Sequence, residues 1–141
     1  MRSIIVFALC FLPVIAPPLR AQDPEEAGIR AALEHYLQGH ATGDGAHMRV
    51  AFHPVAQLFW IVGDTLARRT SDSYAAGFTG RPADDEAGRR RRIVSIDRTG
   101  NAAMAKIELD YPTVRLVDYM SLLKVGNEWK IVNKIFYREA K

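Results

Sequence analysis

The chain has 141 residues, of which 48% are hydrophobic and 25% are charged, and its formal net charge is +3 at pH 7. This length suits one domain with one hydrophobic core and excludes a second domain of ordinary size. The N-terminal segment contributes Arg2 and Arg20, and without them the basic residues nearly balance the 16 acidic ones. The composition therefore gives no reason to expect a nucleic-acid partner.

The N-terminus has the pattern of a secretory signal peptide. Arg2 precedes an apolar run over residues 4–16, and the small residue Ala21 offers a cleavage junction. An apolar run this short does not span a bilayer comfortably, because a span takes roughly 20 residues. We therefore expect residues 1–21 to be removed and the domain, residues 22–141, to be exported to the periplasm or secreted, with no membrane span. The only cysteine, Cys10, lies in the removed segment, which excludes disulfides and thiolate catalysis.

The exported domain is predicted to begin with an amphipathic helix. Apolar residues recur at helical spacing over residues 24–40, and Asp23 can cap the first turn. Tyr36 and His40 lie one turn apart on the apolar stripe of this helix. Both side chains can therefore face the interior of the domain.

A second short helix and a hairpin follow. Asp44 can cap the helix, which is expected to end before Pro54. Residues 56–68 are typical of a β-hairpin with a turn at Gly63-Asp64. The run over residues 58–62 is apolar without alternation, so we expect this strand to be covered on both faces.

The middle of the chain combines a short helix with a loop. Thr70 or Ser71 can cap a third helix that carries Tyr74 and Phe78. The stretch over residues 79–88 is rich in glycine, proline and acidic residues, which indicates a loop.

A second hairpin is predicted over residues 89–111, with its turn at Gly100-Asn101. An unbroken register places Arg91 opposite Asp110, which predicts a cross-strand ion pair. Residues 89–92 are all arginine. Because alternate residues of a strand face opposite sides, this run is interpreted as a solvated strand end and not as a phosphate or RNA contact.

The last predicted hairpin covers residues 118–137, with its turn at Gly126-Asn127. Counting outward from that turn, Asp118 and Asn133 share one face with apolar side chains. These apolar residues are Met120, Leu122, Trp129 and Ile131. A carboxylate and an amide in an apolar wall indicate a pocket. The opposite face would carry Val117, Val132 and Phe136 and could serve as an interface.

Three hairpins preceded by helices predict an α+β domain with a curved antiparallel sheet. Four segments, residues 36–44, 51–54, 118–124 and 128–134, resemble in sequence and order the putative lumazine-binding branch of the nuclear transport factor 2-like superfamily. This resemblance implies a cone, in which the sheet wraps around the helices and encloses a pocket, and commonly a homodimer formed through the outer sheet face. It implies no single function, because relatives include ketosteroid isomerase, scytalone dehydratase, polyketide cyclases and domains that only bind.

The candidate ligand-binding residues are those expected to face the interior of the cone. They are Tyr36, His40, Phe52, Trp60, Asp118, Met120, Trp129 and Asn133. Asp118 is a candidate catalytic acid or base because apolar neighbours should raise its pKa, and His40 is a candidate because imidazole titrates near neutral pH. The alternatives are structural: His40 bonded to a carbonyl at the helix end, Asp118 bonded to a backbone amide or Arg115, and Asn133 bonded to Asp118.

Three functions remain open from the sequence. The first is an exported domain that binds a small apolar or aromatic ligand, the second is a lyase or isomerase that needs no cofactor, and the third is a homodimeric interaction module. The histidines lack the spacing of a metal motif, so we expect no metal. The sequence shows no clear paired-acid or Tyr–Asp arrangement of the kind found in ketosteroid isomerase, and this counts against the enzyme.

Overall fold

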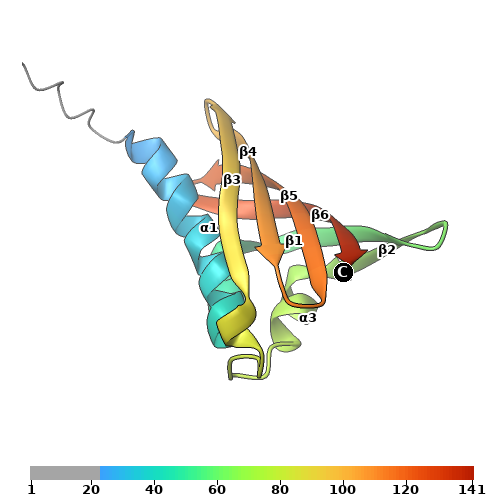
Figure 1. Ribbon diagram of the computed structural model, residues 1–141. Helices are drawn as coiled ribbons and strands as arrows, with labels where there is room; N and C mark the ends of the chain where they lie inside the picture. The colour runs from blue at the N-terminus through green and yellow to red at the C-terminus, as the bar shows by residue number, and fades with distance from the viewer. Residues whose placement is uncertain (1–22) are drawn as a thin grey trace, which may run out of the picture.

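In the computed structural model, which describes residues 23–141, a six-stranded sheet bends around three α-helices (Figure 1). The predicted signal peptide lies outside the described residues. The elements in chain order are α1 (Pro24–Thr42), α2 (Gly45–Ala51), β1 (Phe52–Val62), β2 (Thr65–Thr70), α3 (Ser71–Ala76), a short 3₁₀ helix η1 (Glu86–Gly88), β3 (Arg90–Thr99), β4 (Ala102–Asp110), β5 (Val114–Val125) and β6 (Glu128–Ala140). The prediction of an α+β fold with a curved sheet is confirmed. No helix of residues 23–141 is long and apolar enough to cross a membrane.

The sheet has the strand order β2-β1-β6-β5-β4-β3, and its pairs are antiparallel except β1 with β6. Helix α1 contacts both β6 in the middle of the sheet and β3 at one edge, so the sheet wraps around this helix (Figure 1). The apolar side chains of α1 meet the inner sheet face. Ile29, Leu33 and Tyr36 on the helix are fully buried, as are Ile107 and Ile131 on the strands.

The predicted caps fix the path of the chain between α1 and α2. The Asp23 carboxylate accepts a hydrogen bond from the Glu25 backbone amide at 2.9 Å, and Asp44 does the same for Ala46 at 2.8 Å. Gly43 ends α1 with φ of 70°, and a Cβ there would lie 1.8 Å from the Arg81 carbonyl oxygen. Only glycine fits this junction, which holds the loop after α3 against the end of α1.

The first hairpin forms at its predicted turn, but the prediction that its first strand is covered on both faces over residues 58–62 is wrong near the turn. Ile61, Val62 and Leu66 are each at least 60% exposed. The hairpin of β1 and β2 extends beyond the rest of the sheet (Figure 1), so no second layer from the described part of the chain packs against its tip. Its apolar residues form an exposed surface.

The second hairpin differs from the prediction because β3 contains a bulge. Val94 has no partner, so Arg91 lies opposite Leu109 and not opposite Asp110. The predicted ion pair is wrong. Instead the Arg91 guanidinium donates to both carboxylate oxygens of Glu86, at 2.5 and 2.7 Å, and Asp110 forms an ion pair with Lys141.

The last hairpin follows its predicted register only near the turn. Leu122 lies opposite Ile131, but Val132 is an extra residue, and beyond it Met120 lies opposite Lys134. A bulge turns every following side chain to the other face, because strand side chains alternate with a period of two. The predicted inward position of Asn133 and outward position of Phe136 are therefore wrong. Lys134 and Phe136 face inward.

Candidate functional site

The bulge at Val132 brings a lysine into the centre of the domain. Lys134 lies opposite Met120, which is fully buried, and is itself only 3% exposed. Asn133 pairs with Ser121 on the other face, where its amide nitrogen lies 3.4 Å from the Gln57 carbonyl oxygen. The polar group in the inner wall of this strand is thus a cation and not an amide.

Lys134 completes a buried cluster with Tyr36 and Asp118. The Tyr36 hydroxyl donates to Asp118 Oδ2 at 2.5 Å, and Lys134 Nζ donates to the Tyr36 oxygen at 2.8 Å and lies 3.4 Å from Asp118 Oδ2. Tyr36 and Asp118 are fully buried. Removing a lysine and a carboxylate from water costs several kcal/mol per ion, and the contacts within the cluster offset this cost. The second oxygen, Asp118 Oδ1, is buried and has no hydrogen-bond partner within residues 23–141.

Burial also shifts the proton affinities of this cluster. The pKa of Tyr36 is raised well above its usual 10, first by burial and then by the negative charge of Asp118. The pKa of Lys134 is lowered by burial, although Asp118 opposes that shift. Tyr36 therefore remains a neutral hydrogen-bond donor over the physiological pH range.

A second polar pair joins α1 to α3 beside this cluster. His40 Nε2 lies 2.9 Å from the Tyr74 hydroxyl, and the rings of His40 and Tyr36 meet edge-on with centroids 4.7 Å apart. The pKa of His40 is lowered well below 6.5 by burial and by the positive charges of Lys134, Arg91 and Arg89. Burial raises the pKa of Tyr74. The hydrogen bond between His40 and Tyr74 therefore joins two neutral groups.

The cluster of Tyr36, Asp118 and Lys134 and the pair of His40 and Tyr74 adjoin a cavity of about 330 Å³. Its lining combines aromatic, aliphatic and basic side chains: His40, Leu58, Trp60, Arg69, Tyr74, Arg89, Leu109, Tyr111, Leu116, Lys134 and Phe136. The Trp60 and Phe136 rings stack with their centroids 5.5 Å apart. Lysine has three N–H groups, and two of them face Tyr36 and Asp118, so Lys134 retains one for a molecule in the cavity.

The eight candidate residues from the sequence fall into four groups. His40 and Trp60 line the cavity, while Tyr36 and Asp118 lie behind it and contact Lys134. Met120 is packed in the core.

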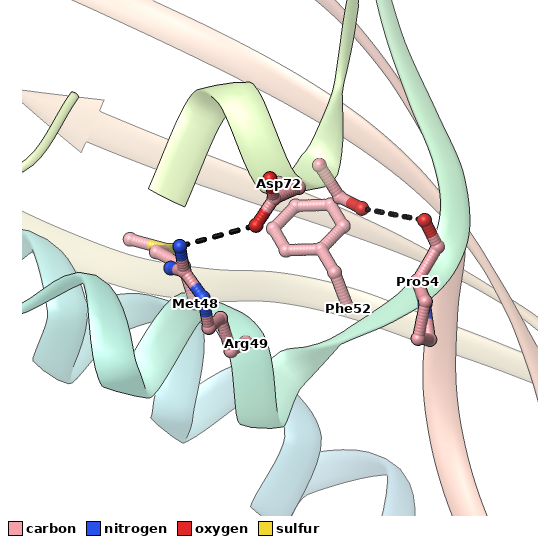
Figure 2. Close-up of a pocket in the computed structure, with 6 residues that line it drawn as sticks. Met48, Arg49, Phe52, Pro54 and Asp72 are labelled. Carbon is pink, nitrogen blue, oxygen red and sulfur yellow. Dashed lines mark hydrogen bonds and ion pairs between the residues drawn. The ribbon is translucent and has the colours of Figure 1, made fainter. Parts of the chain in front are cut away.

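The remaining three lie away from the cavity. Trp129 donates to Glu25 at 2.9 Å near the start of α1. Asn133 lies on the outer sheet face. Phe52 lines a different hollow of about 220 Å³ between α2, β1 and α3 (Figure 2). In that hollow Arg49 pairs with Asp72 at 3.1 Å, and Ser71 Oγ lies 3.4 Å from the Pro54 carbonyl oxygen, so its polar groups already have partners.

Sequence reasoning missed Lys134, Tyr111 and the polar role of Tyr74. Tyr74 was placed on a predicted helix, but its hydroxyl partner His40 lies 34 residues away in the sequence. Lys134 could be found only by placing the bulge at Val132. No group of three or more His, Cys, Asp or Glu side chains that could hold a metal ion occurs within residues 23–141.

Comparison with solved structures defines the class of protein. The fold is that of the nuclear transport factor 2-like proteins. An NTF2-like protein of unknown function from Shewanella baltica OS155 superposes with a TM-score of 0.75 at 27% identity, covering 86% of this chain and 99% of that one. A second one, from Methylobacillus flagellatus KT, gives 0.71 at 32% identity over 86% and 98% of the two chains. A cystatin-like domain from Nostoc punctiforme PCC 73102 gives 0.63 at 14% identity over 86% and 81%, which shows the fold alone.

Within this class, the chain belongs to the family described as "Putative lumazine-binding", whose model matches residues 24–137. No curated protein matches the chain. The family membership covers nearly all of the described residues and agrees with the resemblance noted in the sequence.

Proposed function

We propose that this protein is an exported binding domain that holds a small aromatic or apolar ligand in the cavity beside Lys134. The observation that carries the proposal is the cavity of about 330 Å³, which is lined by four aromatic side chains besides His40. Aromatic walls with a few buried polar groups are typical of small-molecule sites, since the walls supply apolar contact and the polar groups fix orientation. The family name is consistent with a small ring compound as ligand.

Native mass spectrometry of protein purified from an exporting host tests this proposal. We expect a releasable small-molecule mass in the folded protein and a mature N-terminus near Gln22. Leu116→Trp should abolish the bound mass because Leu116 lines the cavity, whereas the matched control Leu123→Trp should retain it because Leu123 is 42% exposed on the outer face. Equal retention by both variants would place the ligand outside this cavity, and full-length protein in the cytoplasm would contradict export.

A lyase or isomerase that needs no cofactor is the second candidate, and the observation that favours it is that His40, whose pKa is lowered by burial, lines the cavity together with Lys134. His40 could take a proton from a carbon next to a carbonyl, and Lys134 would stabilise the developing oxyanion. Hydrogen–deuterium exchange of cyclic ketones in D₂O measures this step. Exchange should fall to background in His40→Gln, and exchange equal in both proteins would exclude His40 as the base.

A homodimer through the outer sheet face is the third part of the proposal. Tyr119, Ile135 and Tyr137 are large hydrophobic residues that are between 43% and 66% exposed there. Ile135→Glu should then convert a dimer into a monomer in analytical ultracentrifugation. Val50→Glu, at a residue of α2 that is 44% exposed, is the matched control and should leave the dimer intact. A dimer that survives Ile135→Glu would exclude this face.

A further inference from the structure

The charged side chains that line the cavity are all cationic. Three of its lining residues are cationic, Arg69, Arg89 and Lys134, and none of the described residues that line it is acidic. The other titratable lining groups do not cancel this charge. His40 stays neutral because its pKa is lowered, and Tyr74 and Tyr111 stay neutral because burial raises theirs.

Protein carboxylates neutralise only part of this charge. Asp118 balances Lys134 from behind the cavity wall. Arg89 uses its Nε atom for an ion pair with Asp85 at 2.8 Å, which leaves its two terminal nitrogens without a carboxylate among the described residues. Arg69 forms no ion pair within residues 23–141, and its hydrogen bond is a 3.4 Å contact from Nε to the Ser73 hydroxyl. Two guanidinium groups at the cavity can therefore take an anion.

The aromatic lining is arranged to support these arginines. The Arg89 guanidinium lies 4.2 Å from the centroid of the Tyr111 ring, and Arg69 lies 5.9 Å from that of Tyr74. Such contacts hold a guanidinium plane beside an aromatic wall while its N–H groups remain free. The stacked pair Trp60 and Phe136 supplies the apolar part of the same cavity. Cation and ring surface thus occur together in one small space.

We propose that the cavity binds a small aromatic carboxylate, with the ring against Trp60 and Phe136 and the carboxylate paired with Arg69 and Arg89. A carboxylate fits the planar fork of arginine and forms charge-assisted hydrogen bonds that are roughly twice as strong as neutral ones. A volume of about 330 Å³ lies at the small end of ligand sites, which favours one or two rings. This inference rests on the proposed ligand-binding function and adds the charge of the ligand to it.

Isothermal titration calorimetry with matched acid and amide pairs tests the charge directly. The probes are 2-naphthoate with 2-naphthamide and indole-3-acetate with indole-3-acetamide, which differ in charge and hardly in shape. We expect each acid to bind at least about tenfold more tightly than its amide, because hydrogen bonds to charged groups contribute more than neutral ones. Added salt should reduce the difference in affinity between each acid and its amide, because dissolved ions screen the charges.

Variants of the cavity arginines then test whether these residues cause the preference for the acid over the amide. Arg69→Gln should weaken binding of the acid by roughly tenfold and change binding of the amide by less than about twofold. Arg98→Gln is the matched control, since Arg98 pairs with Asp23 at the start of α1 and does not line the cavity. Amides that bind as tightly as the acids would overturn the inference while leaving the proposed binding function intact. Absence of binding by all four probes would overturn both. An acid preference that survives Arg69→Gln and Arg89→Gln would overturn the assignment to these arginines.

Discussion

The two halves of the β5–β6 hairpin place different chemistry inside the same sheet. Near the turn, Leu122 faces Ile131 in the predicted register, and the inner face is apolar. Beyond Val132 the inner face carries Asp118 and Lys134. The near half stabilises the fold by burying hydrocarbon, whereas the far half buries charges, which stabilise it little or not at all. Deviations from the simplest pattern are expected where a protein has a site, and the cavity lies beside the far half.

The largest expected loss of stability is at Lys134, and its neighbour in β6, Asn133, should show a much smaller one. Lys134→Ala leaves the Asp118 carboxylate buried without its cation and should lower the free energy of unfolding by about 3–5 kcal/mol. Asn133→Ala removes one long hydrogen bond on the other face and should lower it by less than about 1 kcal/mol. Urea denaturation measures both, and the reverse order would mean that the strand has no bulge.

A paired substitution controls for general damage at this position. Lys134→Met combined with Asp118→Leu removes both charges, so it should recover much of the stability that Lys134→Ala loses. A double variant as unstable as the single one would attribute the loss to packing and not to the unpaired carboxylate.

The near half should respond to loss of volume. Leu122→Ala creates a cavity at a residue that is 1% exposed and should cost about 2–5 kcal/mol in the free energy of unfolding. Leu123→Ala, one residue later on the exposed face, should cost less than about 0.5 kcal/mol. Thermal unfolding followed by circular dichroism compares the two, and equal losses would contradict the register near the turn.

The third prediction concerns pH and the far half of the hairpin, where Lys134 and His40 line the same cavity. In the unfolded chain His40 gains a proton as the pH falls below 6.5, but the folded protein keeps it neutral because its pKa is lowered. The unfolded state therefore binds more protons below pH 6.5. As the pH is lowered through this range, the free energy of unfolding should fall by up to about 1.4 kcal/mol per pH unit. The urea midpoint should depend less steeply on pH between pH 7 and 5 in His40→Gln than in the unaltered protein. The same dependence in both proteins would show that His40 is protonated in the folded state.

The smallest expected effect comes from an exposed ion pair. Arg49 and Asp72 lie 3.1 Å apart at the hollow of Figure 2, with side chains 52% and 77% exposed. Asp72→Ala should lower the free energy of unfolding by less than about 1 kcal/mol because water weakens an exposed pair, and by less still at high salt because dissolved ions screen the two charges. Chemical denaturation at two salt concentrations measures this. A loss as large as that of Lys134→Ala would contradict the distinction between buried and exposed pairs.

Much of the architecture was predictable because its signals are local. Asp23 and Asp44 cap their helices as expected, and Gly63, Gly100 and Gly126 adopt the positive φ that the predicted turns require. These features depend on a few adjacent residues, so sequence patterns report them well. The inward position of Asp118 was also predicted and is confirmed, although its actual partner opposite is Phe136 and not Ile135.

The sequence alone determined the order of helices and hairpins, the family, and an acid in the inner wall of the last hairpin. Only the tertiary structure decided which polar group joins that acid. Tyr36 and Asp118 are 82 residues apart in the chain and meet only when the sheet wraps around α1. The bulges at Val94 and Val132 turn Arg91, Lys134 and Phe136 inward, and no short-range pattern marks them. The physical reason is that a strand has a period of two, so one extra residue, favoured by packing across the whole sheet, reverses every side chain beyond it.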